Sequence, residues 1–112
     1  MKNLTKKEEL IMKVIWELNI ASVNQVIEKL PKPSPHYNTI STIIRILESK
    51  NFVSHKSSGR KYRYYASIPK DDYVMYMLKR IIRNYYGNSF ENLLSHLIAI
   101  EKISYEKLKE VI

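Results

Sequence analysis

One short β-prone segment interrupts a chain whose apolar residues otherwise recur at helical spacing. Residues 52–56 and 60–66 are β-prone runs, and Gly59 between them supplies the positive φ that a tight hairpin turn needs. On both sides of this segment the apolar residues lie three or four positions apart, which is typical of amphipathic helices. The sequence therefore predicts a mainly α fold with one small β-hairpin. A chain of 112 residues can bury one modest core.

Two capped helices are predicted before residue 35. Thr5 and Glu8 have the spacing of a capping box, in which each side chain bonds to the other residue's backbone N–H. Ser22 and Gln25 repeat this spacing at the start of a second, shorter helix. The proline-rich run at residues 31–35 then ends that helix, because proline lacks a backbone donor and restricts the residue before it.

The next helix is predicted from about His36 to Lys50, and its polar face is unusual. Serine, threonine and asparagine are poor interior helix formers, because their side chains compete for backbone hydrogen bonds. Short polar side chains beside one arginine suit close approach to base edges and phosphates, so this face is expected to read DNA. The alternative is a polar stripe that faces solvent. The residues of this face are Asn38, Ser41, Thr42 and Arg45.

The predicted hairpin is basic and follows the polar helix directly. A basic β-ribbon in this position is the wing of a winged helix-turn-helix, expected to lie along the phosphate backbone or reach the minor groove. The tyrosines Tyr62, Tyr64 and Tyr65 either stack on bases or fix the hairpin to the core. The residues expected near the DNA backbone, at the helix start and in the wing, are His36, Tyr37, Lys56, Arg60, Lys61 and Arg63.

The net charge of +8 is concentrated in the first part of the chain. Residues 1–69 contain 12 of the 19 Lys and Arg residues but only 5 of the 11 Asp and Glu residues, a net charge of +7. Residues 70–112 have a net charge of +1. An excess of this kind raises the affinity for a polyanion such as double-stranded DNA. A solvated basic surface that only aids solubility is the alternative.

Residues 70–112 predict three amphipathic helices that cannot form a sizeable core alone. Gly87 ends the first, Asn88 is predicted to cap the second, and Ser104 is predicted to cap the last. Pairing with a second copy is expected, although packing against the winged helix of the same chain is the alternative. We therefore predict a DNA-binding domain at residues 1–69 and a helical dimerisation region at residues 70–112. The expected interface residues are Tyr73, Met77, Ile81, Tyr85, Phe90, Leu93, Leu94, Leu97 and Leu108.

Residues for catalysis, metal binding or cofactor binding do not gather in this sequence. The absence of cysteine excludes disulfides, thiolate nucleophiles and cysteine metal sites. His36, His55 and His96 fall in three different predicted elements, and a glycine-rich phosphate loop is missing. We therefore expect no enzyme, no metal and no cofactor. Apolar stretches are far shorter than the roughly 20 residues that span a bilayer, so a cytoplasmic protein without membrane insertion is expected.

The order of elements and motifs resembles the penicillinase-repressor family, the BlaI, MecI and CopY type. The likeness covers essentially the whole chain and implies a homodimeric transcriptional repressor whose operator has dyad symmetry, often controlling antibiotic-resistance or copper genes. It adds Thr39 to the expected base contacts and places wing contacts on Arg60, Lys61 and Arg63. The matching motifs are Leu4-Thr5-x-x-Glu8, residues 37–45, Leu47-Glu48-Ser49-Lys50, Gly59-Arg60-x-Tyr62-Arg63-Tyr64, Phe90-x-x-Leu93-Leu94 and Ile103-Ser104-x-x-x-Leu108.

The sequence departs from the family's pattern in three places. Ile46 replaces an arginine that is frequent there, and Asn51 replaces the glycine that ends the polar helix. The β-lactam repressors are cleaved at an Asn-Phe pair in a pathway with a membrane sensor protease, but here His96-Leu97 aligns with that pair. Proteolytic induction is therefore absent or uses another site. A winged-helix protein–protein module that does not bind DNA is the alternative function.

Overall fold

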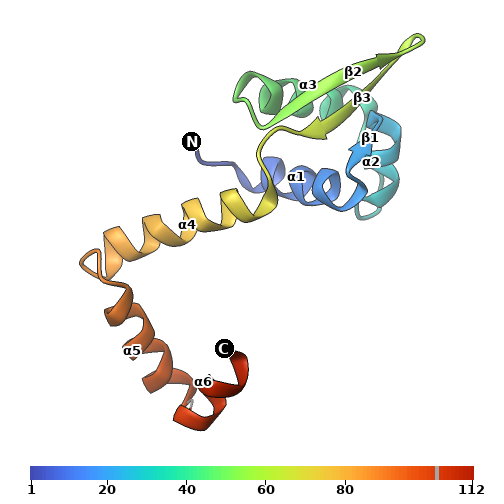
Figure 1. Ribbon diagram of the computed structural model, residues 1–112. Coiled ribbons are helices and arrows are strands. Elements are labelled where there is room, and N and C mark those ends of the chain that lie inside the picture. The colour runs from blue at the N-terminus through green and yellow to red at the C-terminus, as the bar shows by residue number, and fades with distance from the viewer. Residues whose placement is uncertain (103) are drawn as a thin grey trace. The chain divides into compact units, whose positions relative to one another are not determined.

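The computed structural model describes residues 1–102 and 104–112 (Figure 1). Ile103, a member of the last tail motif named above, lies outside the described residues. Two compact units, Met1–Tyr73 and Val74–Ile112, are described separately below. The functional division into residues 1–69 and 70–112 stays a prediction. The elements are α1 (Lys6–Leu18), β1 (Ile20–Ala21), α2 (Val23–Lys29), α3 (Tyr37–Ser49), β2 (Val53–Ser58), β3 (Lys61–Ala66), α4 (Lys70–Tyr85), α5 (Phe90–Glu101) and α6 (Tyr105–Val111).

Local capping explains where the helices of the first unit begin and end. Both predicted capping boxes are confirmed: the Thr5 side chain accepts from the Glu8 N–H, the Ser22 side chain accepts from the Gln25 N–H, and both are reciprocated. Asn51 adopts a left-handed φ of 66°, which is the conformation that glycine usually supplies after a helix. The predominantly helical fold with a small hairpin is thus confirmed, and its helix limits follow from short-range signals.

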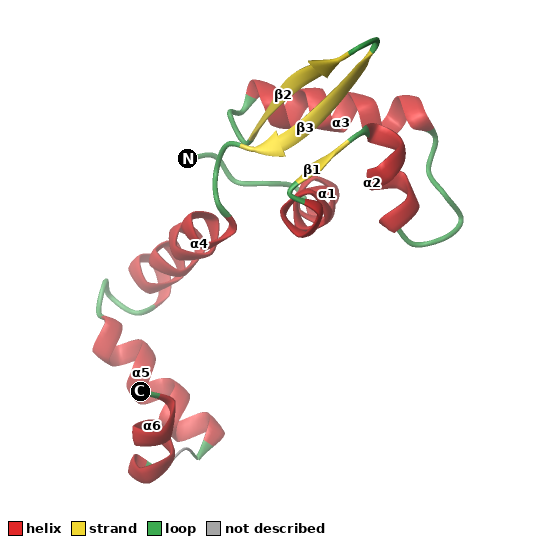
Figure 2. Ribbon diagram, turned by 45° about the vertical axis from the view of Figure 1, so that its right-hand side comes forward, coloured by secondary structure: helices red, strands yellow, loops and turns green. Residues whose placement is uncertain are grey.

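The sheet contains a third strand that the sequence analysis did not predict. β1 pairs with β3 and β3 pairs with β2, all antiparallel, so the order is β1-β3-β2 (Figure 2). The register joins Ile20 to Tyr65 and Ala21 to Tyr64. A strand of two residues shows no alternation of its own, which is why residues 19–21 were expected to be only a break between helices.

The core of the first unit lies between its helices and one face of the sheet. Tyr73 belongs to this core: its ring centroid lies 5.9 Å from that of Trp16 and 5.6 Å from that of Phe52. It was expected in the dimer interface, but these aromatic rings of the same chain bury it to 4% exposure. The largest fully buried side chains are Ile11, Met12, Ile15, Val26, Ile44, Leu47, Phe52 and Val53.

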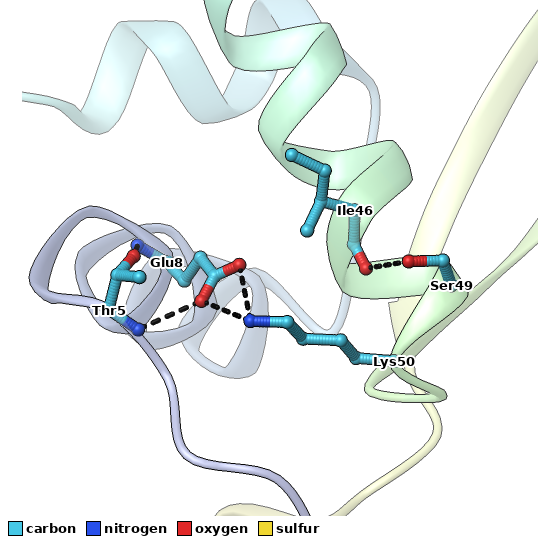
Figure 3. A network of polar contacts seen from close by, with 5 residues as sticks. All are labelled: Thr5, Glu8, Ile46, Ser49 and Lys50. Carbon is cyan, nitrogen blue, oxygen red and sulfur yellow. Dashed lines mark hydrogen bonds and ion pairs between the residues drawn. The ribbon is translucent and has the colours of Figure 1, made fainter.

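A buried carboxylate joins the start of α1 to the end of α3 (Figure 3). Both Glu8 carboxylate oxygens accept from Lys50 Nζ, at 2.8 and 2.9 Å, and one also accepts from the Thr5 N–H at 2.8 Å. Burial by itself raises the pKa of Glu8, but the hydrogen bonds and charge of Lys50, with the Thr5 bonds, lower it overall. The C-terminal end of α3 is therefore fixed by an ion pair as well as by apolar packing.

The described residues of the second unit bury few side chains. Leu93 is the buried residue of α5, whereas most large apolar side chains of this unit are exposed. Ser89, not the predicted Asn88, caps α5, because Asn88 follows Gly87 in a left-handed turn with a φ of 58°. Ser104 caps α6 as predicted. Among the described helices, none combines the length and the apolar character that crossing a membrane requires.

Candidate nucleic-acid interface

The exposed side of α3 carries three polar residues at helical spacing. Asn38, Thr42 and Arg45 lie at positions i, i+4 and i+7, so they share one face of the helix, and all three are exposed. Ile40 and Ile44 are buried on the side that packs into the core. The helix therefore holds a row of hydrogen-bonding side chains at its surface on a rigid support. Such a row can approach the edges of bases.

Two residues predicted to contact bases lie outside this row. Ser41 is only 5% exposed, and its hydroxyl accepts a hydrogen bond of 3.3 Å from Arg45 Nη2. Ser41 is therefore placed to orient Arg45. Thr39 is exposed, but it borders an apolar groove formed with Leu10 of α1 and the prolines of residues 31–35.

A groove of about 450 Å³ separates α3 and the start of α2 from the hairpin. It collects residues that are far apart in the sequence, and three of its lining side chains, Arg45, Arg60 and Lys61, are cations. Glu48 is the acid among the lining residues. A cation-lined groove next to a polar helix face suits a phosphate backbone. The full lining is Ser22, Val23, Asn24, Tyr37, Ser41, Arg45, Glu48, His55, Arg60, Lys61, Tyr62 and Tyr64.

The predicted wing cations divide between two sides of the hairpin. Lys56 pairs with Arg63 across the ladder, while the neighbouring pair, His55 and Tyr64, points to the opposite face. Lys56 and Arg63 therefore lie on the face away from the groove, and Lys56 Nζ is 5.4 Å from the centroid of the Tyr65 ring. Arg60 and Lys61, at the turn, line the groove. Strand alternation accounts for Lys56 and Arg63 on the outer face, but not for Lys61, which pairs with Ser58 beside the turn and yet lines the groove.

His36 and Tyr37 both lie at the start of α3. His36 is the N-cap residue in extended conformation, is exposed, and makes no side-chain capping bond. Tyr37 opens the helix, is half exposed, and lines the groove. Their positions are compatible with the expected backbone contacts.

Glu48 and His55 are site residues that the sequence analysis did not single out for this role. The carboxylate Oε2 of Glu48 lies 2.5 Å from Nδ1 of His55. The His55 ring centroid lies 4.6 Å from that of Tyr62 and 5.9 Å from that of Tyr64. Tyr64 is buried, so it fixes the hairpin to the core, and burial followed by the Glu48 charge raises the pKa of its phenol. The contact between α3 and β2 forms only through tertiary packing, so no local sequence pattern predicts it.

The sequence also matches a known protein family. A family model described as penicillinase repressor matches residues 4–112, nearly the whole chain. The chain belongs to the penicillinase repressor family. The resemblance drawn from its motifs is confirmed, and since this family consists of transcriptional repressors, the chain is not an enzyme.

Relatives of this penicillinase repressor family member are similar along most of their length. The methicillin resistance regulatory protein MecI of Staphylococcus aureus is 28% identical over 104 residues, which cover 90% of this chain and 83% of MecI. The penicillinase repressor of Bacillus licheniformis is 26% identical over 102 residues, covering 90% and 80%. The solution structure of monomeric Bacillus licheniformis BlaI in complex with the blaP half-operator has a TM-score of 0.54 and 33% identity, covering 64% of this chain and 89% of that one. The winged-helix fold is thereby confirmed.

Proposed function

We propose that this chain is a dimeric repressor that binds operator DNA of dyad symmetry and acts in the cytoplasm. The observation that carries the proposal is the exposed row Asn38, Thr42 and Arg45 on α3, beside a groove lined by Arg60 and Lys61. In this arrangement α3 enters the major groove and the wing contacts phosphates. The BlaI relative in complex with a half-operator supports DNA as the partner.

The dimer is proposed from the exposed apolar surface of the second unit. Tyr85 is 79% exposed, Phe90 56% and Leu97 43%, which is a costly arrangement for a chain in water. A second copy is the partner that also explains an operator with two half-sites, about 34–36 Å apart or a multiple of that distance. The proposed interface residues are Met77, Ile81, Tyr85, Phe90, Leu93, Leu94, Leu97 and Leu108.

Fluorescence anisotropy with labelled duplexes from upstream of the chain's own coding sequence tests this function. We expect saturable binding to one duplex, weaker binding to a shuffled duplex of equal composition, and a steep loss of affinity between 50 and 200 mM salt. Equal, weak binding to both duplexes would contradict sequence recognition. Absence of binding at low salt would instead favour the winged-helix protein–protein module.

Release from DNA through a membrane sensor protease, with cleavage at a site other than His96-Leu97, is the proposed route of induction. His96 and Leu97 lie inside α5, so the aligned peptide bond is part of a continuous helix. Cleavage there requires local unwinding of α5, because a protease binds its substrate as an extended chain. An immunoblot of cells exposed to a β-lactam gives the answer: a shortened chain supports this route, and a full-length chain on a derepressed gene excludes it.

A further inference from the structure

Glu48 is an acid in a groove that is otherwise suited to an anion. It lines the groove with Arg45, Arg60 and Lys61, where its charge opposes the approach of a phosphate. Yet its carboxylate is not free, because Oε2 lies 2.5 Å from His55 Nδ1. The contact with the hairpin explains why an acid stands at this position of the groove.

The contact bridges two elements that have to act together. Glu48 belongs to the last turns of α3, and His55 lies on β2 opposite Tyr64 in the ladder. Val53, at the base of the hairpin, is buried in the core, whereas residues 55–63 are exposed. His55 thus makes its contact with α3 at the point where the hairpin leaves the core. Beyond it lie Arg60 and Lys61.

We propose that Glu48 and His55 are positioning residues that set the angle of the wing to α3, and so place Arg60 and Lys61 against the DNA backbone. The inference rests on the proposed function. Both side chains are about a third exposed, so their ion pair adds little to folding stability. Its effect is on the direction of the wing.

The contact joins a histidine to a carboxylate among charged neighbours. The titratable and charged groups that line the groove around His55 are Tyr37, Arg45, Glu48, Arg60, Lys61, Tyr62 and Tyr64, and Lys56 is its neighbour on β2.

Glu48→Gln gives opposite results under two explanations. If Glu48 only repels phosphates, removing its charge tightens operator binding at every pH. If Glu48 positions the wing, operator binding weakens by about threefold to fivefold, because an amide oxygen is a weaker acceptor than a carboxylate. The matched control is Glu28→Gln, which removes the same charge from the exposed part of α2, outside the groove.

His55→Phe separates the ring contacts from the contact with Glu48. Phenylalanine keeps an aromatic ring beside Tyr62 and Tyr64 but cannot donate to the carboxylate. We expect operator binding weaker than that of the wild type. A variant that binds the operator as tightly as the wild type would overturn the proposal.

Hydrogen exchange of the free full-length chain tests the wing without DNA. At pH 6, backbone amides of residues 56–63 should exchange faster in Glu48→Gln and His55→Phe than in the wild type, while α1 amides should not change. Equal exchange in the wing would overturn the positioning role, whatever the DNA results. Failure of the wild type to bind any duplex, with the exchange difference present, would count against the proposed function alone.

Discussion

At the scale of single residues, Glu8 shows how one side chain can serve two contacts. Its carboxylate completes the capping box at Thr5 and also binds Lys50, 42 positions further along the chain. Taking a carboxylate out of water is costly, and the cost is offset only when its oxygens are well bonded. Here both oxygens accept from Lys50 Nζ. The stability of α1 therefore depends on a residue at the C-terminal end of α3.

Lys50→Met tests this dependence. The variant leaves the buried Glu8 charge without its cation, so the free energy of unfolding should fall by about 2–4 kcal/mol. Thr5→Ala, which removes only the cap, should cost about 1 kcal/mol. Lys13→Met is the control, since Lys13 pairs with Glu9 on the surface and should cost at most about 0.5 kcal/mol. Urea denaturation measures all three, and equal losses for Lys50→Met and Lys13→Met would contradict the bridge.

The pH dependence of stability follows from the lowered pKa of Glu8. Its ordinary value is 4.5, and the folded state favours the ionised form. The stabilisation is therefore complete above the ordinary value and is lost as the pH falls through the lower, folded value. Unfolding curves from pH 7 to pH 3 should show the wild type and Glu8→Gln converging at the acid end. A constant difference across this range would count against the assignment.

Base and backbone contacts should respond differently to mutation. Thr42→Ala removes a side chain from the exposed row of α3, so preference for the operator over a shuffled duplex should fall by about tenfold. Arg60→Ala should weaken binding to both duplexes and lower the salt slope by about 1. Arg63→Ala, on the other face of the hairpin, should lose less affinity than Arg60→Ala. Fluorescence anisotropy at several salt concentrations measures these effects. A larger loss of affinity for Arg63→Ala than for Arg60→Ala would indicate that the DNA backbone lies against the outer face of the hairpin.

At the scale of elements, patterns among residues close in sequence predicted more of the fold than patterns among residues far apart. The capping boxes, the polar helix and the glycine turn were predictable because each depends on residues within a few positions of one another. β1 was missed because two residues have no pattern, and Asn88 was misassigned because a left-handed turn after Gly87 moves the cap to Ser89. The Glu48–His55 contact was not predictable, since it exists only once the hairpin packs against α3.

The hairpin turn supplies a prediction at this scale. Gly59 has a φ of +65°, and a Cβ added there would meet no atom within 4 Å. A substitution therefore causes backbone strain without a clash, and Gly59→Ala should cost about 1 kcal/mol. Gly59→Asn should cost less, because asparagine tolerates this conformation. Thermal melting distinguishes the two, and a larger loss for asparagine would contradict this account of the turn.

At the scale of the whole molecule, dimerisation and monomer folding depend on different leucines. Leu97 is exposed in one chain, whereas Leu93 is already buried there. Leu97→Ala should therefore weaken the dimer, and with it operator binding, without lowering the helix content of the chain. Leu93→Ala should also destabilise the second unit, by about 2 kcal/mol or more. Analytical ultracentrifugation and circular dichroism separate these effects, and a wild-type monomer at micromolar concentration would remove the dimer from the proposal.

The ion pair between α1 and the end of α3 also constrains which substitutions such a chain can accept during evolution. A neutral residue in place of Lys50 alone leaves a buried charge, and a neutral residue in place of Glu8 alone leaves the lysine without its partner. Replacement of both by apolar residues avoids either cost. Positions 8 and 50 should therefore vary as a pair among sequences of this fold, with single changes rare and paired changes tolerated.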